Sequence, residues 1–385
     1  MGGDEKMIIG YKYRLYPNKT QEEQIQKTFG CVRFVYNQTL AYRQEKYKNE
    51  KVTLSRIDCN NWKNQVLKKK YPWLTEIDKF ALDNSIFDLE YAYQNFFKYG
   101  KNYPIFKSKK NNYQSYRTDC QKNGHGCKFN IEVDFDNNKV KLPKLKWVKC
   151  KLHRQFEGKI KSATISQTPS GKYFVSILVE TEIEPTESTG AMVGIDLGIK
   201  DLVITSDGEK FDNLNLTKKY EDKLAKERRK LAHKVKGSNN YNKQRIKVAK
   251  IHEKIVNCRK DYLHKISHKL ISENQVIVSE DLSIESMIAD KNCANNKNIN
   301  DCGWGKLIRQ LQYKSDWHNR NYVKVDRYFA SSQTCSCCGY KNPEIKDFRN
   351  VKKWICQQCN THHDRDINAA INILNEGLRL LEEAS

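Results

Sequence analysis

Four cysteines in two closely spaced pairs carry the clearest chemical signal in the sequence. Two residues separate Cys335 from Cys338 and Cys356 from Cys359, and seventeen residues lie between the pairs. Each pair can turn two thiolates toward one small ion, and the stretch between them is long enough to return the second pair to the first. This spacing predicts a tetrahedral four-cysteine zinc ribbon that holds one structural Zn²⁺.

Other cysteines leave two alternatives open. Cys337 is an additional thiol between two expected ligands and could compete for the zinc ion, although the two-residue spacing favours its neighbours. A second metal site is a weaker hypothesis, because the spacing of its candidate ligands matches no common zinc pattern. Those candidates are Cys120, His125, Cys127 and Cys150.

Three carboxylates stand where expected strands end or an expected helix begins. Asp196 ends a strand and is flanked by glycines, which let a ligand or a neighbouring backbone come close. Glu280 ends a second strand, and Asp366 lies in the first turn of a helix that contains small residues. Oxygen ligands of this kind suit Mg²⁺ or Mn²⁺, and two such ions can support phosphodiester hydrolysis. The sequence therefore predicts a metal-dependent enzyme.

Each acid also has an ordinary interpretation. An aspartate at a strand end is most often a solvated turn residue. Asp364 fits a helix N-cap better than a metal ligand. Asp281 would point away from Glu280 on the same strand, and Asp326 is the main competitor for the third carboxylate. Only the combination of the acids with the zinc pattern and the basic charge favours a metal site.

The chain carries a large excess of positive charge. Its 385 residues include 69 Lys and Arg against 46 Asp and Glu, a net charge of +23. This excess favours a polyanionic partner, because each neutralised phosphate releases counterions. Membrane binding is a weaker hypothesis, since no run approaches the roughly 18 apolar residues of a spanning helix. The odd number of cysteines, 13, and the lack of a secretory segment near the start favour reduced thiols and a cytoplasmic location.

The first half of the chain predicts a strand, a helical bundle and further strands. Residues 7–16 alternate apolar and basic side chains, which indicates a strand. Thr20 and Glu23 have the spacing of a capping box. Helical spacing follows over 25–40, around Trp62, and over 80–97; strands are expected at 140–150, 163–166 and 173–180. One face of the last strand would carry Tyr173, Val175, Ile177 and Val179, and residues 181–190 have the composition of a linker.

The second half predicts an α/β arrangement. Residues 192–198 and 202–205 are expected strands with a hairpin turn at Asp207-Gly208, and 218–272 should form a helical hairpin broken near 237–240. A buried strand at 276–280 precedes an Asn-rich loop at 290–303. A strand at 322–328, the zinc element and a last helix from about Asp364 complete the chain.

These motifs together resemble TnpB, a family of transposon-encoded RNA-guided DNA endonucleases ancestral to the type V CRISPR effectors. The resemblance covers essentially the whole chain in order. It rests on residues 193–198, 278–282, 331–339 and 364–373, with further likeness at 10–17, at 96–97 and at 104–110.

The resemblance implies a multidomain α+β fold. A β-rich wedge domain with an inserted helical recognition bundle would precede an RNase H-like (RuvC) domain that contains the inserted four-cysteine zinc ribbon. Asp196, Glu280 and Asp366 would be the RuvC-type catalytic acids. The expected boundaries are 1–20 and 105–185 for the wedge, 21–104 for the helical domain, 190–329 and 363–385 for the RuvC-like domain, and 330–362 for the ribbon.

The resemblance also implies a mechanism and partners. A guide RNA would pair with target double-stranded DNA beside a short flanking motif, and one RuvC-like site would cut both strands with Mg²⁺ or Mn²⁺. One chain is expected to act with one RNA, in the cytoplasm and at the nucleoid of a prokaryote. The Asn-rich segment 290–303 would be a lid over the site.

Basic and aromatic residues between 91 and 117 are the expected nucleic-acid contacts, because aromatic faces stack on bases and cations bind phosphates. The candidates are Tyr91, Lys98, Lys101, Lys107, Lys109, Lys110, Tyr113 and Arg117. Packing inside the bundle is the alternative for Tyr91, Phe96 and Phe97. The basic hairpin 218–270 is either a wall of the heteroduplex channel or a solvated surface.

Two other functions remain open. An RNA-guided repressor without cleavage should have lost at least one of the three acids, and this chain retains all of them. A guide-independent RNase H-like nuclease or transposase would keep the acids but would bind no discrete RNA.

Overall fold

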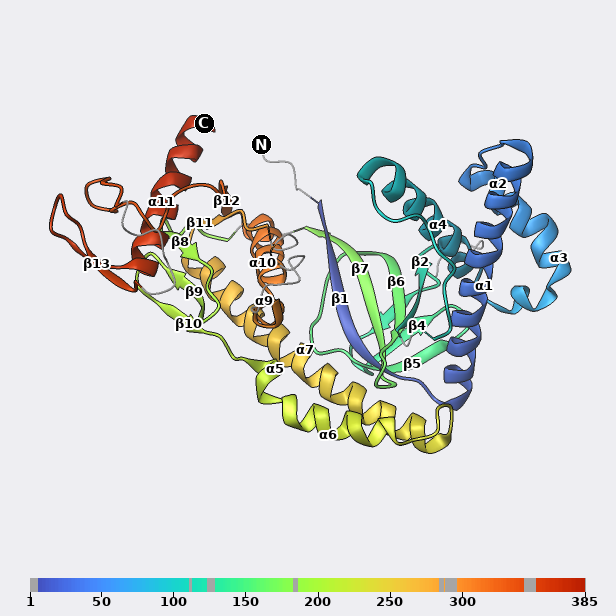
Figure 1. Ribbon diagram of the computed structural model, residues 1–385. Helices are drawn as coiled ribbons and strands as arrows, with labels where there is room; N and C mark the ends of the chain where they lie inside the picture. The colour runs from blue at the N-terminus through green and yellow to red at the C-terminus, as the bar shows by residue number, and fades with distance from the viewer. Residues whose placement is uncertain are drawn as a thin grey trace. The chain divides into compact units, whose positions relative to one another are not determined.

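The computed structural model describes residues 6–110, 113–122, 129–182, 186–283, 287, 296–342 and 351–384 (Figure 1). The chain divides into two compact units, residues 1–182 and 183–385. The division falls within the segment expected to be a linker. No helix in the described ranges is long and apolar enough to cross a lipid bilayer.

The first unit contains a curled sheet of seven strands, in which every neighbouring pair is antiparallel. The first strand lies in the middle of the sheet, where Ile9 pairs with Val179 and Leu15 pairs with Cys150. The order is β2-β6-β7-β1-β5-β4-β3, with bounds β1 (Lys6–Tyr16), β2 (Gln114–Asp119), β3 (Glu132–Asp134), β4 (Lys139–Leu142), β5 (Lys146–Lys151), β6 (Lys159–Gln167) and β7 (Tyr173–Glu182).

Side-chain alternation places the core on one face of this sheet. The four β7 residues expected to share a face are all buried. The prediction of one strand over 140–150 is wrong, because β4 and β5 form a hairpin. Lys144 and Lys146 have positive φ angles of 63° and 57° at that turn, a conformation that residues with a side chain adopt rarely. Pro143, directly after β4, is the turn signal inside this stretch, because proline cannot donate a hydrogen bond to a sheet.

Helices follow β1 and return the chain to β2. They are α1 (Lys19–Glu50), α2 (Arg56–Trp62), the π-helix η1 (Lys63–Leu67), α3 (Lys68–Lys70), the 3₁₀-helix η2 (Pro72–Glu76) and α4 (Lys79–Tyr99). The capping box lies two residues earlier than predicted, at Asn18 and Gln21 in place of Thr20 and Glu23. Asn18 is the N-cap of α1, accepting a hydrogen bond from the Gln21 N–H, and the Gln21 side chain accepts one from the Asn18 N–H.

The second unit is built on a five-stranded mixed sheet in the order β10-β9-β8-β11-β12. The strands β8, β11 and β12 run parallel, and β9 is antiparallel to β8. The strands are β8 (Met192–Asp196), β9 (Asp201–Thr205), β10 (Lys210–Asp212), β11 (Val276–Glu280) and β12 (Asn321–Val325). The helices are α5 (Leu216–Lys219), α6 (Glu221–Ala232), α7 (Asn239–Glu273), α9 (Asn296–Cys302), α10 (Trp304–Trp317) and α11 (Arg365–Ala384).

Helices cover both faces of this sheet, as the continuous burial of β8, β9 and β11 requires. Val193 and Ile277 pack with Leu270 of α7 and with residues of α10. Val278, which points the other way, packs with Ile373 of α11. The result is a three-layer α/β unit, and α6 with α7 forms the predicted helical hairpin.

Part of the Asn-rich segment departs from the expected loop. Residues 296–302 form α9, and the remainder of the expected lid, 290–295, lies outside the described residues. Asp301 is buried in this helix and accepts hydrogen bonds from Thr217, at 2.7 Å, and from Arg259. These partners lie far away in the sequence, so the asparagine-rich composition alone does not indicate the helix.

Candidate functional site

The register of two parallel strands determines where two of the three expected acids lie. Ser279 of β11 pairs with Ile195 of β8, so Glu280 and Asp196, the next residues, end adjacent strands at one edge of the sheet. Parallel strands present their carboxyl ends at the same edge. The structure therefore brings these two carboxylates together although they are far apart in the sequence.

A glycine in β8 seats the helix that supplies the third acid. A Cβ atom at Gly194 would lie 2.1 Å from the Ala370 carbonyl oxygen and 2.7 Å from the Leu374 nitrogen, both in the backbone of α11. Ala369 and Ala370 are fully buried at this contact, as expected from their size. Asp366 lies in the first turn of the helix, so the close approach of α11 carries its carboxylate toward the strand ends.

We expect Gly194→Ala to destabilise the second unit and to lower activity, because the methyl group must push α11 away from β8. Overpacking of this kind typically costs about 1–3 kcal/mol of unfolding free energy. Thermal denaturation of the purified protein measures the loss. Gly10→Ala is the matched control, since its Cβ would meet only the Ser176 hydroxyl at 3.9 Å. Equal melting temperatures for the two variants would contradict the seating role.

The electrostatics of the three acids indicate a shared site. The pKa of Asp196 is raised to about 7 by burial, and then by the negative charges of Glu280 and Asp366. Burial also raises the pKa of Glu280, against a 2.5 Å hydrogen bond from the Ser331 hydroxyl. Mutually repelling, partly buried carboxylates favour binding of a divalent cation, which supplies the missing positive charge.

An arginine beside the third acid was not expected from the sequence. The Arg365 guanidinium donates to one Asp366 carboxylate oxygen, at 2.8 Å from Nε and 2.5 Å from a terminal nitrogen. The three carboxylates are not among the described groups whose ligand atoms all lie within 4.8 Å of one another. A cation bound at Asp366 would therefore share this carboxylate with Arg365.

The competing acids have other partners. Asp364 caps α11, because its carboxylate accepts from the Asp366 and Ile367 N–H groups at 3.1 Å and 3.3 Å. Asp281 forms ion pairs with Lys324 at 3.0 Å and Arg327 at 3.3 Å. Asp326 accepts from the Tyr328 N–H at 2.8 Å. The main acidic contributors to the pKa shift of Asp196 are instead Glu280 and Asp366.

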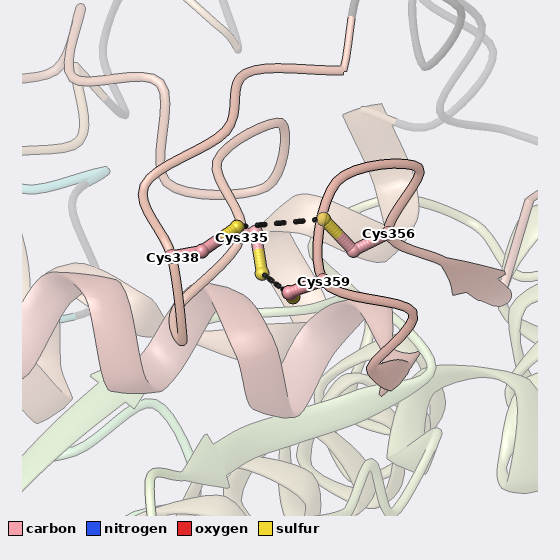
Figure 2. A group of neighbouring side chains, drawn as sticks. All are labelled: Cys335, Cys338, Cys356 and Cys359. Carbon is pink, nitrogen blue, oxygen red and sulfur yellow. Dashed lines mark hydrogen bonds between the residues drawn. The ribbon is translucent and has the colours of Figure 1, made fainter.

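The two cysteine pairs meet as the spacing predicts. The Sγ atoms of Cys335, Cys338, Cys356 and Cys359 all lie within 4.8 Å of one another, and Figure 2 shows them turned toward a common centre. Cys335 and Cys359 are 3.6 Å apart, and Cys338 and Cys356 are 3.5 Å apart. A tetrahedral ion with Zn–S bonds of about 2.3 Å requires sulfur separations of about 3.8 Å, so the arrangement fits one Zn²⁺.

Both pairs sit on the same type of turn. The Gly339 N–H donates to the Cys335 carbonyl and the Asn360 N–H donates to the Cys356 carbonyl, each at 2.9 Å. Gly339 and Asn360 have positive φ angles of 77° and 55°, which glycine and asparagine tolerate best. The short strands β13 (Lys353–Ile355) and β14 (His362–Asp364) pair beside the second turn. Thr361 lowers the pKa of Cys359 to about 6 through its hydroxyl and backbone hydrogen bonds, favouring the thiolate.

Two asparagines connect the cysteine element to the acidic site. The buried Asn368 of α11 accepts from the Ser336 N–H at 2.9 Å and donates to the Thr334 carbonyl at 2.8 Å. Asn372, one turn later, donates to the Ser331 carbonyl at 2.7 Å. Sequence analysis missed both roles. Amides four residues apart on an otherwise apolar helix face are the signal that could have identified them.

The additional thiol Cys337 has a different neighbourhood. Cys335, Cys337 and His363 form a second group within 4.8 Å, with His363 Nε2 3.1 Å from the Cys335 sulfur. Because it shares Cys335, this group is an alternative ligand set to the four cysteines. The other hypothetical metal site remains untested, since His125 and Cys127 lie outside the described residues.

The expected nucleic-acid contacts separate into exposed and packed residues. Tyr91 is 60% exposed and Tyr113 is 51% exposed. Phe97 is 73% exposed, so neither Tyr91 nor Phe97 is a core residue of the bundle. Lys98, Lys101, Lys109 and Lys110 are exposed as well. Lys107, which is also exposed, and the partly buried Arg117 have partners within the protein. Lys107 lies over the Tyr36 ring at 4.1 Å, and the Arg117 Nε donates to the Asn84 side chain at 2.8 Å.

A second basic and aromatic surface lies on the sheet of the first unit. Lys12 and Arg14 of β1 lie over the Phe174 ring of β7, at 4.8 Å and 5.2 Å from its centre, and Arg14 also lies over Tyr16. These residues alternate with the buried Tyr13 and Leu15. The alternation of basic and apolar residues over 7–16 was visible in the sequence, but only the pairing of β1 with β7 adds Phe174.

Three family profiles match consecutive parts of the chain. A profile described as "Helix-turn-helix domain" matches residues 7–51, one described as "Probable transposase" matches 175–290, and one described as "Cas12f1-like, TNB domain" matches 304–373. The structure of a Cas12f1–sgRNA–target DNA complex contains a chain of similar fold, with a TM-score of 0.61. The match covers 96% of this chain and 99% of that chain at 14% identity.

Full-length relatives are considerably more similar in sequence. A "Putative RNA-guided DNA endonuclease" of Streptomyces pristinaespiralis is 35% identical over 96% of this chain and 89% of the relative. The "Putative RNA-guided DNA endonuclease InsQ" of Escherichia coli (strain K12) is 33% identical over 98% of this chain and 94% of the relative. By these matches and by the motifs that its fold brings together, the chain belongs to the TnpB family.

Proposed function

We propose that this protein is an RNA-guided DNA endonuclease with one RuvC-like active site. The observation that carries the proposal is the convergence of Asp196, Glu280 and Asp366 at one end of the α/β sheet. The names of the full-length relatives supply the reaction class, and the charge of +23 suits a complex with RNA and DNA.

In this proposal the three acids hold Mg²⁺ or Mn²⁺. The bound ions would supply a water-derived nucleophile and would stabilise the leaving oxygen of the phosphodiester. Asp196 and Glu280 position their carboxylates from the rigid ends of paired strands, and Asp366 does so from the start of α11. Arg365 balances the charge of Asp366, and Ser331 orients Glu280 through its hydrogen bond.

The remaining parts of the chain would position nucleic acid around that site. Residues 1–20 and 105–185 would form the wedge, 21–104 the recognition bundle, 190–329 and 363–385 the nuclease domain, and 330–362 a ribbon that holds one structural Zn²⁺. One chain would act with one guide RNA. The guide would determine sequence specificity by base pairing, and the protein would recognise the short flanking motif.

Sequencing of the RNA that co-purifies with the protein tests the guide. A discrete RNA with a constant structured part and a variable end is the expected result. The complex should then cut a DNA duplex that matches the variable end, in a reaction that requires Mg²⁺. Cleavage without any bound RNA would instead support a guide-independent nuclease, and binding without cleavage would support a repressor.

Replacing Lys98 and Lys101 by Gln should weaken RNA or DNA binding and flatten its salt dependence. Each lost phosphate contact lowers the slope of log affinity against log salt by about 0.7 on single strands and about 0.9 on duplex DNA. Binding titrations at several salt concentrations measure the slope. Lys46→Gln, which removes a lysine paired with Glu50 at 2.6 Å, is the control. An unchanged slope for the double variant would remove this stretch from the interface and would direct attention to α6 and α7.

A further inference from the structure

A cleft in the helical part of the first unit lies apart from every residue assigned above. It has a volume of about 680 Å³ and lies between α1 and the segment around η2. Gly30, Phe34 and Gln38 of α1 line one side, and Trp73 and Ile77 line the other. All of these residues belong to one compact unit, so the cleft does not depend on how the two units are arranged.

Gly30 shows that the space over α1 is open. It lies well inside a helix of 32 residues, where glycine is among the poorest helix formers. The glycines that seat α11 touch other parts of the protein, whereas a Cβ at Gly30 would meet nothing within 4 Å. No contact within the described protein therefore requires a glycine at this position. A close approach by a molecule from outside the chain would require one.

The walls of the cleft suit a flat aromatic heterocycle. The Phe34 and Trp73 rings lie 5.0 Å apart at an interplanar angle of 58°, and Trp73 is 41% exposed. The Tyr71 ring packs edge-on against Phe34 at 4.9 Å and also contacts Trp73 at 5.8 Å, so the three rings form one cluster. The Gln38 side chain forms no hydrogen bond within the described residues, so its amide can both donate and accept.

The charges at the rim suit the phosphates attached to such a ring. Lys27 and Arg33 line the cleft, and Arg33 also donates to the Gln114 side chain at 3.0 Å. Glu76 is the acid that lines it, and its ion pair with Lys27 is long, at 3.8 Å, between two well-exposed side chains. An aromatic slot with a basic rim is the arrangement by which proteins hold a single-stranded base and its backbone.

We propose that this cleft binds one unstacked nucleobase of the guide RNA, between Trp73 and the open backbone face of Gly30. The inference rests on the proposed function. RNA is favoured over the DNA target because loops and bulges of a folded RNA present bases that are already unstacked, whereas a base in duplex DNA must first be extruded at a cost.

Filling the cleft from Gly30 tests this proposal without destabilising the helix. RNA affinity should fall progressively in Gly30→Ala, Gly30→Leu and Gly30→Trp, and by about tenfold in the last, the effect expected for one lost base-stacking contact. Melting temperatures should not fall, because each replacement is a better helix former than glycine. The probe is the RNA that co-purifies with the full chain, transcribed in vitro and titrated against each variant.

Asn49→Trp is the matched control, because it adds the same side chain to an exposed position of α1 outside the cleft. Ultraviolet cross-linking of the wild-type complex should attach a nucleotide to the peptide that contains Trp73, and Gly30→Trp should abolish that adduct.

Three outcomes would overturn the inference. Unchanged RNA affinity of Gly30→Trp, with no adduct near Trp73, would mean that the cleft takes no base. Normal RNA affinity with weakened DNA binding would place a DNA base there instead. If the wild-type protein forms an oligomer and Gly30→Trp does not, the cleft would be a protein interface. If the wild-type protein binds no RNA at all, the proposed function itself fails, so the two failures are distinguishable.

Discussion

Asp196→Ala, Glu280→Ala and Asp366→Ala should each reduce the rate of DNA cleavage by more than about a hundredfold. Removing a residue that only supports a metal ligand already costs up to about a hundredfold in activity, and removing the ligand itself should cost more. Guide RNA and target binding should change little, because phosphate-contacting cations carry affinity whereas metal ligands act on the chemistry. The measurement is single-turnover cleavage of a matched duplex by the RNA-loaded protein, alongside a binding titration with the same duplex.

Asp281→Ala and Asp326→Ala serve as matched controls for this series. Both acids lie close in sequence to the strand ends, but Asp281 pairs with two cations and Asp326 accepts from a backbone N–H. Their loss should leave cleavage within a few-fold of wild type. If Asp366→Ala cut normally and Asp364→Ala or Asp326→Ala did not, the third ligand would be misassigned.

Removal of the zinc ion is the second change with a large expected effect. The intact protein should contain one zinc per chain, and Cys356→Ser should lose it. A structural zinc contributes on the order of 10 kcal/mol to the folding of small zinc domains at pH 7, so the ribbon should unfold without it. Elemental analysis of purified protein measures the zinc, and limited proteolysis around residues 330–362 detects the unfolding.

Loss of the ribbon should also reduce cleavage, although the four-cysteine set offers no open coordination position to a substrate. The physical connection runs through Asn368, Asn372 and Ser331, which bind the ribbon entry to α11 and to Glu280. Cys337→Ser should retain zinc at one ion per chain, because its sulfur belongs to the alternative group. Two zinc ions in the wild type would revive the site at Cys120 and Cys150, and full zinc in Cys356→Ser would contradict the ligand assignment.

Local sequence determined the zinc site almost completely. Each CxxC pair and the residue after it, Gly339 or Asn360, form one turn whose conformation depends on residues close in the sequence. The spacing of the pairs therefore suffices to predict the cluster. The strand patterns of β1 and β7 were equally readable, because burial of one sheet face imposes a period of two on the sequence. The strands β8 and β11 were readable as short apolar runs, because both of their faces are buried.

The three acids were identifiable as candidates, but their convergence depends on the tertiary structure. Asp196 and Glu280 meet because β8 and β11 pair in parallel, and Asp366 joins them because Gly194 lets α11 lie directly on β8. The motif resemblance pointed to the same three residues. It gave no indication of the ion pair between Arg365 and Asp366 or of the hydrogen bonds from Asn368 and Asn372 to the ribbon entry.

Other features could be decided only by contacts between distant residues. The α9 helix over 296–302 is held by Thr217 and Arg259, neighbours that no local pattern specifies. The open face of Gly30 is the same kind of feature, since a glycine in a helix can equally indicate close packing. Spacing and periodicity determine which residues can do chemistry and which faces are buried. Pairing register and close packing decide which of those residues meet, because they depend on atoms brought together only in the folded chain.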